Sequence, residues 1–306
     1  MPVYLAKRLG QAVFILIGIT LVTYVLLYLV PADPVRQIAG RSATPETVES
    51  IRRQLGLDLP LWQQYLRYLG NLLHGDLGRS YIQKTEVTAL IISRLPATLL
   101  LMAGAIAVEL LIGLSAGIFA ATRRGRTSDR VVMILSFAAV SAPQFVVGIL
   151  LLYLFAVQLA WLPLGGYGTF AHLVLPAITL GILGGGWYSR MTRSSMIEVL
   201  RQDYIQTARA KGASSARVLL VHALRNAALP IVAMIGLDIG MFMSGAVVVE
   251  SVFGWPGIGQ LTWQAIQTVD IPIIVGVTTV AAGFIVLGNL LADLVAPFVD
   301  PRIRLR

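Results

Sequence analysis

The sequence contains no cysteine and only 3 histidines in its 306 residues. The absence of cysteine excludes a disulfide framework and a thiolate metal site, and histidines and acidic residues do not cluster at metal-ligand spacing. The phosphate-binding pattern G-x-x-x-x-G-K-[S/T] is absent as well. We therefore predict that this chain holds no metal or cofactor and is not an enzyme. Any ATP that drives it must be bound by another chain.

Charged residues are also scarce, since they make up 13% of the chain while 57% is hydrophobic. A soluble domain has about 25% charged residues. Several apolar runs exceed the roughly 18 residues that a helix needs to cross a bilayer, which predicts an integral membrane protein. The net charge of +9 does not indicate nucleic acid, because lysine and arginine gather in the cytoplasmic loops of membrane proteins. The first apolar run is long enough to remain as a span, so we expect no cleaved signal peptide.

The apolar runs predict an all-α, polytopic membrane protein with six transmembrane helices. We place them at about 9–30, 95–121, 131–159, 173–188, 231–249 and 271–298. Basic residues precede the first span and follow the second, fourth and sixth spans, whereas the two loops at 160–172 and 250–270 contain none. The positive-inside rule then places both termini in the cytoplasm. The expected parts are an N-terminal segment with the first span (1–30), an external insertion (31–94), a five-helix core (95–298) with a cytoplasmic loop (190–229), and a cytoplasmic tail (299–306).

The external insertion carries its own helix signals. Thr44 followed by Pro45 is typical of a helix start, and Gly56 is typical of a helix end. An apolar stripe at helical spacing follows. It consists of Trp62, Tyr65, Leu66, Leu69 and Leu73.

Two acidic residues, Glu109 and Asp238, fall near the middle of the second and fifth predicted spans. Intramembrane carboxylates are candidates for proton relays. They leave a proton-coupled secondary transporter or channel as an alternative function. The simpler interpretation is a buried hydrogen bond or a protonated acid that faces the bundle.

Glycines recur inside the spans. Gly113 to Gly117 match the G-x-S-x-G pattern of serine hydrolases, but that motif needs a strand, a sharp turn and a helix. Here the pattern lies within a continuous apolar helix, so we interpret these residues as a packing surface. The three consecutive glycines at 184–186 weaken a helix, and we expect this site to bend or to line a passage.

The cytoplasmic loop between the fourth and fifth spans is too charged to lie in lipid. Ser195 with Glu198 forms a capping-box pattern, which predicts a helix from about Met196. Gly212 can end that helix in a left-handed conformation, and Ser214 can cap a second helix. A short, rigid helix between two spans can carry a push from a cytoplasmic partner into the membrane.

This loop resembles the "EAA" loop of ABC importer permeases, through the spacing of Gln206-Thr207-Ala208, Gly212 and the later Leu229-Pro230. Gln206 stands where glutamate is usual, and the Leu-Pro pair comes a few residues late. Both departures are familiar in the first permease subunit of dipeptide, oligopeptide and nickel importers. The resemblance implies that the loop docks into a cleft on the ATP-hydrolysing subunit. The residues that would couple are Tyr204, Gln206, Thr207, Ala208, Arg209, Ala210, Lys211, Gly212 and Ala213.

Other segments resemble the same branch, and with the insertion they cover nearly the whole chain. They are Ser141-Ala142-Pro143-Gln144-Phe145, 175–180, 249–259 and the closing Asp300-Pro301-Arg302. The resemblance implies the architecture of a type I ABC importer permease. We assign the expected substrate path and gate to Pro143, Phe145, Gly184, Gly185, Gly186, Phe253, Trp255 and Pro256.

The resemblance also implies partners and a location in the bacterial cytoplasmic (inner) membrane. The partners are a second homologous permease subunit, two ATP-binding subunits that hold ATP and magnesium, and an external solute-binding protein. The insertion either packs as a cap over the spans or contacts the binding protein. The loop at 250–270 is expected to face the binding protein. The substrate stays open among peptides, nickel chelates, glutathione and opines, and the lack of a metal cluster favours peptides.

Overall fold

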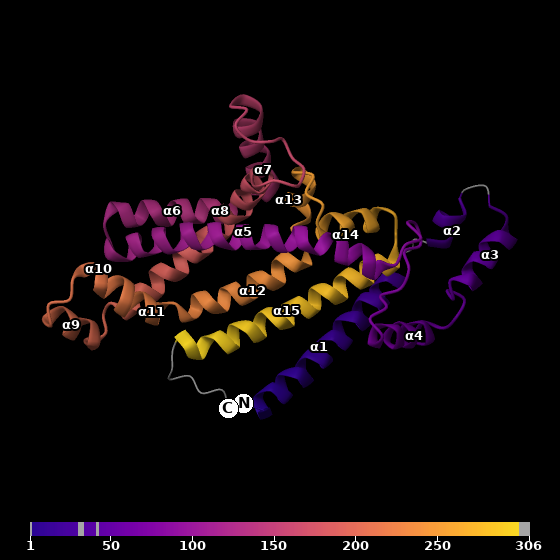
Figure 1. Ribbon diagram of the computed structural model, residues 1–306, viewed down its shortest axis with the longest axis horizontal. Helices are drawn as coiled ribbons and strands as arrows, with labels where there is room; N and C mark the ends of the chain where they lie inside the picture. Colours follow the sequence, from indigo (N-terminus) through magenta and orange to yellow (C-terminus); the bar gives the residue numbers. More distant parts are fainter. Residues whose placement is uncertain (1, 30–33, 41–42, 300–306) are drawn as a thin grey trace.

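A computed structural model describes residues 2–29, 34–40 and 43–299 of the chain (Figure 1). The all-α prediction is confirmed, because every element of the described residues is a helix and their only β contact is an isolated bridge between Arg79 and Glu86. The α-helices are α1 Pro2–Leu29, α2 Pro34–Ala39, α3 Pro45–Gln54, α4 Leu61–Leu73, α5 Val87–Thr122, α6 Thr127–Ser141, α7 Gln144–Leu152, α8 Phe170–Val199, α9 Asp203–Ala210, α10 Ser215–Arg217, α11 Leu224–Ala227, α12 Leu229–Gly245, α13 Val247–Val252, α14 Ile258–Gln267 and α15 Ile271–Val299. Two π-helical segments are η1 Tyr153–Gln158 and η2 Val218–Ala223.

The long helices α5 and α8 lie side by side and run in the same direction (Figure 1). A Cβ atom added to Gly113 would lie 2.2 Å from the Cβ of Tyr188, and one added to Gly117 would lie 2.5 Å from the Cβ of Thr192. Small residues allow this close approach of helix backbones. Ser115, between the two glycines, donates its hydroxyl to the carbonyl four residues earlier in the same helix, at 2.6 Å. The G-x-S-x-G run is therefore a packing surface, as predicted.

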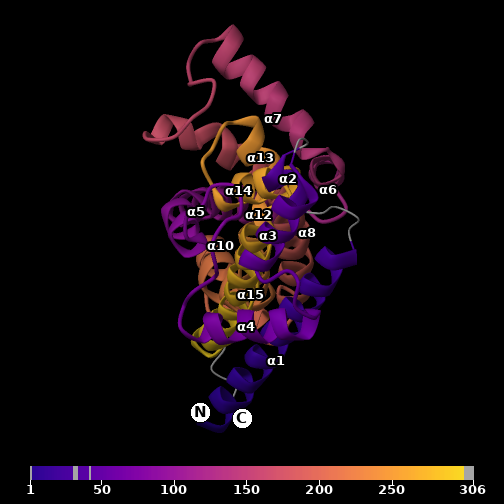
Figure 2. The ribbon, with the colours of Figure 1, turned by 90° about the vertical axis from the view of Figure 1, so that its right-hand side faces the viewer.

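A second layer is formed by α12 and α15, with α1 beside α15 (Figures 1 and 2). These helices alternate in direction: Gly240 of α12 packs on Ile285 of α15, and Arg8 of α1 forms an ion pair with Asp293 near the end of α15. α6 also runs opposite to α8. Gly186 of α8 packs on the C-terminal half of α6. The relative directions of the helices therefore match the alternation of the predicted spans.

The predicted number of six spans is not confirmed. By length and composition, three described helices can cross a membrane, namely α5, α8 and α15. The count rises to five if two bent pairs, Thr127–Ser141 with Gln144–Gln158 and Ser215–Ala227 with Leu229–Met243, each form one span. In α1 the apolar stretch Gly10–Leu26 is shorter than a full span.

The third predicted span is broken, not merely kinked. Its two halves meet at an angle of 99°, and α7 projects away from the other helices (Figures 1 and 2). The break lies at Pro143, which cannot donate a helical hydrogen bond. The preceding Ala142 has extended backbone (ψ 130°), as a residue before proline prefers. The expectation of one kinked helix over 131–159 is therefore wrong.

In the insertion, α3 begins and ends as predicted. The Thr44 hydroxyl accepts a hydrogen bond from the backbone N–H of Thr47 at 3.3 Å, and Pro45 is the first helical residue. Gly56 has a φ of +68°, and the N–H of Leu57 closes the helix end on the carbonyl of Arg52 at 2.9 Å. This left-handed glycine is the usual end of such a helix.

The helix α4 is amphipathic as expected, but much of its apolar stripe is exposed. Trp62 is 61% exposed and Leu73 is 87% exposed. Tyr65 of the same stripe is half-buried and donates its hydroxyl to the carbonyl of Ile17 in α1 at 3.0 Å. Leu72, outside the stripe, packs against a buried apolar cluster that includes Leu77 and Val87.

Candidate functional site

The predicted coupling loop forms two short helical segments at the end of the bundle opposite the insertion (Figure 1). The first is α9, and the second consists of α10, η2 and α11. The helix predicted to begin near Ser195 does not begin there, because α8 continues to Val199. The chain turns at Arg201 and Gln202 before α9 starts.

Packing against α5 explains why α8 extends beyond its predicted end at Tyr188. Thr192 and Met196, one and two turns further on, are fully buried. The side chain of Thr192 lies against Gly117 of α5. The capping-box pattern at Ser195 lies inside this packed helix, where there is no helix end to cap. The helix start predicted there is therefore wrong.

Ile205 anchors α9 to the rest of the protein. It is fully buried, and sequence reasoning missed it, although it is the only large aliphatic residue of α9. Its partners come from the ends of α5 and α8 and from the second segment. The buried members of this apolar cluster are Ala121, Met196, Ile205, Val218, Ala223 and Ala227.

The predicted coupling residues lie around this anchor. Ala208 and Ala213 are half-buried, while the others point outward. The exposed ones are Tyr204, Gln206, Thr207, Arg209, Ala210, Lys211 and Gly212. The Tyr204 hydroxyl accepts a hydrogen bond from the side-chain amide of Asn226 at 2.9 Å, which ties the two segments together. The exposed surface of the loop is therefore polar and rich in small residues. The buried cluster around Ile205 holds this surface in place.

Gly212 ends α9 as predicted, with a φ of +81°. The N–H of Ala213 donates to the carbonyl of Ala208 at 3.1 Å, and the N–H of Gly212 donates to that of Arg209 at 2.9 Å. These two bonds form a complete Schellman motif. Ser214 caps the second segment, since its hydroxyl accepts from the N–H of Arg217 at 3.4 Å. The turn between the two segments is therefore defined by the backbone.

An ion pair fixes the C-terminal part of α8. Arg193 donates two hydrogen bonds to the carboxylate of Asp129, at 2.6 and 2.8 Å, and the backbone N–H of Gly125 donates a third at 2.9 Å. Asp129 is buried. Sequence reasoning missed this pair, although Asp129 is the only acidic residue in the arginine-rich stretch 123–130. The pair joins the C-terminal extension of α8 to the first turn of α6.

The intramembrane carboxylates come together where the two helix layers meet. Glu109 of α5 lies close to Asp238 of α12, and Tyr188 of α8 donates its hydroxyl to Asp238. Glu109 is only 3% exposed, and one oxygen of its carboxyl group has no hydrogen-bond partner among the described residues. Both carboxyl groups therefore face the inside of the bundle.

The three glycines at 184–186 do not bend α8, which runs through them without interruption. They bring its neighbours close. A Cβ at Gly184 would lie 1.8 Å from a carboxylate oxygen of Glu109, and a Cβ at Gly186 would lie 2.6 Å from the carbonyl of Ser136 in α6. The helix is therefore not broken at these glycines, and the close packing of α5 and α6 occupies the space beside them.

The loop at 250–270, named the outer loop after its place in the predicted topology, contributes its predicted gate residues to the core. Trp255 is fully buried and donates its indole N–H to the carbonyl of Ala97 at 2.9 Å. Phe253 is buried as well, and its carbonyl accepts from the N–H of Gly166 at 2.8 Å. Pro256 is half-buried. These contacts tie the loop to α5 and to the connection between α7 and α8.

Pro143 and Phe145 sit at the break between α6 and α7. Phe145 is 52% exposed, so it does not join the buried outer loop. Phe253 does reach α7, where its ring lies 3.3 Å from the position of a Cβ on Gly148. The structure therefore brings Phe253 to α7 and leaves the three glycines of α8 in a separate helix contact.

The buried carboxylate of Glu250 holds the outer loop in place through hydrogen bonds. Sequence reasoning did not single out this residue. Its carboxylate accepts hydrogen bonds from the hydroxyl of Thr98 at 3.1 Å and from the N–H of Gln260 at 2.8 Å. A Cβ at Gly257 would lie 2.1 Å from a carboxylate oxygen. The two glycines of the Trp-Pro-Gly-Ile-Gly run are therefore needed to let this carboxylate in.

Glu250 should make the outer loop sensitive to pH. Burial raises the pKa of Glu250 above 4.5, and the hydrogen bonds from Gln260 and Thr98 oppose this rise only in part. In the unfolded chain the carboxyl group ionises first, so the stability of the loop is fully present below pH 4.5 and is lost as pH rises through the raised pKa. Hydrogen exchange of the amides at 250–260, corrected for intrinsic rates, should show this loss of protection in the wild type. The same pH dependence in Glu250→Gln would contradict the assignment.

Comparisons with known proteins cover almost the whole chain. The family model of the binding-protein-dependent transport system inner membrane component matches residues 113–305, and the model of the N-terminal part of such membrane components matches residues 1–102. Both parts of the chain, the insertion included, are therefore matched by models of the same kind of protein.

Several curated proteins are similar over their full length. The chain is 40% identical over 330 aligned positions to the di/tripeptide transport system permease protein DppB of Pseudomonas aeruginosa, and 38% identical over 301 positions to the glutathione transport system permease protein GsiC of Escherichia coli. It is 41% identical over 314 positions to a putative peptide permease protein of Brucella ovis. Each comparison covers 98% of this chain and 98% of the relative.

A solved structure has a similar fold. An inward-facing conformation of the MetNI methionine ABC transporter matches with a TM-score of 0.55 and 18% sequence identity, over 69% of this chain and 96% of that chain. At this identity the similarity concerns the fold alone.

Proposed function

The chain belongs to the family of binding-protein-dependent transport system inner membrane components, and on that premise we propose that it is the permease subunit of an ATP-driven importer of di- or oligopeptides or related small solutes. The observation that carries the proposal is the full-length similarity to peptide and glutathione permeases. The permease performs no bond chemistry, and ATP hydrolysis belongs to partner chains.

We place six spans in the membrane, with both termini in the cytoplasm. The alternating directions of α1, α12 and α15 and the parallel pair of α5 and α8 support this topology. In it, each bent helix pair forms one span, and α1 supplies the first. The tail at 299–306, with the Asp-Pro-Arg segment, lies outside the described residues except for its first residue.

The surface of α9 is the proposed docking site for an ATP-binding subunit. Its small residues permit close approach, and Arg209 and Lys211 add positive charge that can pair with acidic groups on the partner. Such pairs steer association more than they add affinity. Because Ile205 holds α9 to the ends of α5 and α8, a displacement of α9 would be passed to both helices. Closure of two ATP-binding subunits would then open the permease pair outward, and hydrolysis would return it.

The outer loop and the α6–α7 break are the proposed side of substrate entry, where an external solute-binding protein would dock. Phe253 and Trp255 are buried, so they would act by positioning the loop, and the more exposed Phe145 would contact the solute or the partner. A structure of the complex with its binding protein tests this assignment. A loop 250–270 far from both the binding protein and the pore mouth would contradict it.

The carboxylates Glu109 and Asp238 are not expected to carry a coupled proton. They are held in a packed contact with Tyr188, and nothing in the comparisons favours a proton-coupled transporter. We expect Glu109→Gln and Asp238→Asn to leave ATP-driven dipeptide uptake within about twofold of the wild type, since a neutral amide keeps a hydrogen bond at each position. The measurement is uptake into liposomes that contain the reconstituted complex, with ATP inside.

The same liposomes test the proposed function. Uptake should require internal ATP, the ATP-binding subunits and the binding protein. Uptake driven by an imposed pH gradient without ATP, and lost in the two variants, would overturn the importer assignment in favour of the proton-coupled alternative.

A further inference from the structure

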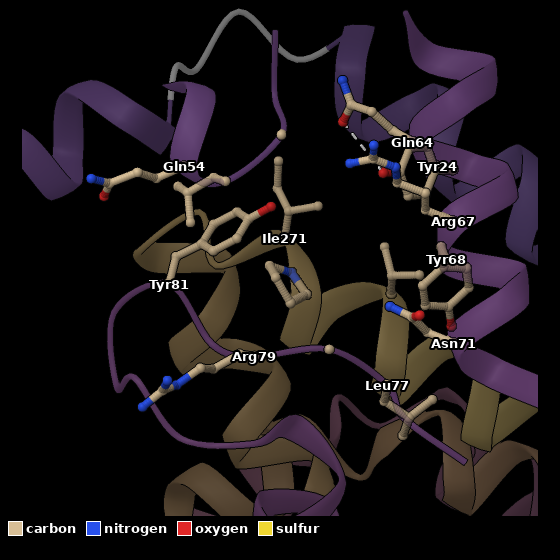
Figure 3. A pocket seen from close by; sticks show the side chains of 15 residues that line it. Tyr24, Gln54, Gln64, Arg67, Tyr68, Asn71, Leu77, Arg79, Tyr81 and Ile271 are labelled. Atoms are coloured by element: carbon tan, nitrogen blue, oxygen red, sulfur yellow. Dashed lines mark hydrogen bonds between the residues drawn. The ribbon is translucent and has the colours of Figure 1, made fainter. Parts of the chain in front are cut away.

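A pocket lies between the insertion and the helix bundle, far from the coupling loop. It is an open pocket with a volume of about 310 Å³, lined by Tyr24 of α1, the end of α3, α4, the turn after α4, and the start of α15 (Figure 3). This volume is at the lower end of the range for small-molecule sites, roughly 300–1,000 Å³. A solute the size of an amino acid or a dipeptide would fill it.

The charge of the pocket favours an anion. Arg67 and Arg79 line it, and no acidic residue does. Two carboxylates next to the lining residues have other partners: Asp76 accepts from the N–H of Gly78 at 2.8 Å, and Asp270 accepts from the Ser80 hydroxyl and from two backbone N–H groups. Neither forms an ion pair with Arg67 or Arg79.

Arg67 is the central cation of the pocket. Its guanidinium makes no hydrogen bond or ion pair with any described residue, and it points into the pocket from α4 (Figure 3). Arg79 points away from the centre in the same view and donates its Nε–H to the carbonyl of Lys84 at 2.7 Å. A guanidinium with no ion-pair partner among the described residues matches a monoanion such as a carboxylate, which it binds through two parallel N–H groups.

Two neutral side chains that can donate hydrogen bonds, Tyr81 and Asn71, line the same pocket as Arg67. The hydroxyl of Tyr81 points into the pocket from the wall opposite Arg67 (Figure 3), and neither it nor the amide of Asn71 has a partner among the described residues. Burial raises the pKa of Tyr81, so its hydroxyl keeps its proton at neutral pH and can donate. The Tyr68 hydroxyl, by contrast, is paired with Thr279 at 2.6 Å.

One part of the lining is apolar and consists of Leu55, Leu77, Ile271, Pro272 and Val275, while Gln54 and Gln64 add two amide side chains elsewhere. An anion alone would leave this part of the pocket without a partner. We propose that the pocket binds a free amino acid or short peptide, with its carboxylate on Arg67, its polar groups near Tyr81 and Asn71, and an apolar side chain on the floor. The site is separate from the proposed path through the bundle.

The test uses the full-length protein in lipid nanodiscs and measures binding of radiolabelled leucyl-leucine by equilibrium dialysis. We expect saturable binding that weakens at least tenfold in Arg67→Gln and a few-fold in Tyr81→Phe. Leucyl-leucine amide, which lacks the carboxylate, should compete at least tenfold less well than the free dipeptide. Arg53→Gln is the matched control, because Arg53 pairs with Glu49 on the outer side of α3. It should bind like the wild type.

Several results would overturn the proposal. They are no saturable binding by the wild type, equal binding by Arg67→Gln, equal competition by the amide, or competition by inorganic phosphate as strong as that by the dipeptide. Circular dichroism checks that the variants are folded, and Tyr81→Phe keeps the test decisive if Arg67→Gln is not. Reconstituted uptake should persist in Arg67→Gln, which separates this site from the transport path.

Discussion

Replacement of Gly212 by leucine is expected to lower ATP-driven uptake about tenfold while the membrane bundle stays folded. The backbone of Gly212 has a φ of +81°, and a left-handed conformation costs an L-residue roughly 1–2 kcal/mol. A Cβ atom at this position would meet no atom within 4 Å, so the whole cost is conformational. A penalty of about 1.4 kcal/mol shifts an equilibrium tenfold. The equilibrium affected is that between the intact turn and one in which α9 no longer presents its docking surface.

Asparagine at the same position is the matched control for this experiment. Asparagine tolerates the left-handed conformation better than other residues with a Cβ, so Gly212→Asn should keep most of the uptake. The complex should be purified and its subunit stoichiometry, ATP turnover and uptake measured together. We expect Gly212→Leu to assemble poorly, or to hydrolyse ATP without transport. Unchanged assembly, turnover and uptake would mean that this turn is not the coupling element.

Local signals in the sequence predicted the helix ends correctly where the chain itself makes the necessary hydrogen bonds. Thr44 and Ser214 cap their helices, and Gly56 and Gly212 end theirs with positive φ. Each of these ends involves residues within a few positions of one another. The basic loops likewise predicted an alternation of helix directions that the structure reproduces.

These local signals could not predict features that depend on contacts between residues far apart in the sequence. The burial of Met196 extends α8 past a capping-box pattern, and the glycines at 184–186 stay helical because α5 and α6 pack against them. The 99° break at Pro143 also depends on what lies on either side. A proline inside an apolar run marks a weak point in the helix, but tertiary packing sets the angle.

Contacts between distant residues also limited what the sequence could predict about the proposed coupling loop. The proposed coupling residues could be named from the resemblance, because they lie within one short loop. Ile205, which anchors that loop, packs against residues as distant in sequence as Ala121. Asp129 and Arg193 are 64 positions apart. No single-sequence pattern states such a pairing. The lone acid in a basic stretch and the lone aliphatic residue in a polar helix were the available signals.

Removal of Arg193 should be the most destabilising of the changes considered. Arg193→Ala leaves the buried carboxylate of Asp129 with only the N–H of Gly125. Breaking a fully buried ion pair costs about 3–5 kcal/mol. The side chain of Arg193 is 26% exposed, so we expect a smaller loss, on the order of 2–3 kcal/mol, in the free energy of unfolding. SDS titration in mixed micelles, followed by circular dichroism, measures it.

A second variant on the same helix separates the ion pair from a general effect of arginine. Arg190 lies over the rings of Phe137 and Trp187, at 4.2 and 5.1 Å from their centroids. Loss of a partly exposed cation–π contact costs about 0.5–1 kcal/mol, so Arg190→Ala should destabilise less than Arg193→Ala. The double change Asp129→Asn with Arg193→Gln should recover part of the loss, because it leaves no unpaired charge. Equal destabilisation by the two single alanine variants, with no recovery in the double variant, would show that the Asp129–Arg193 pair does not hold the C-terminal part of α8.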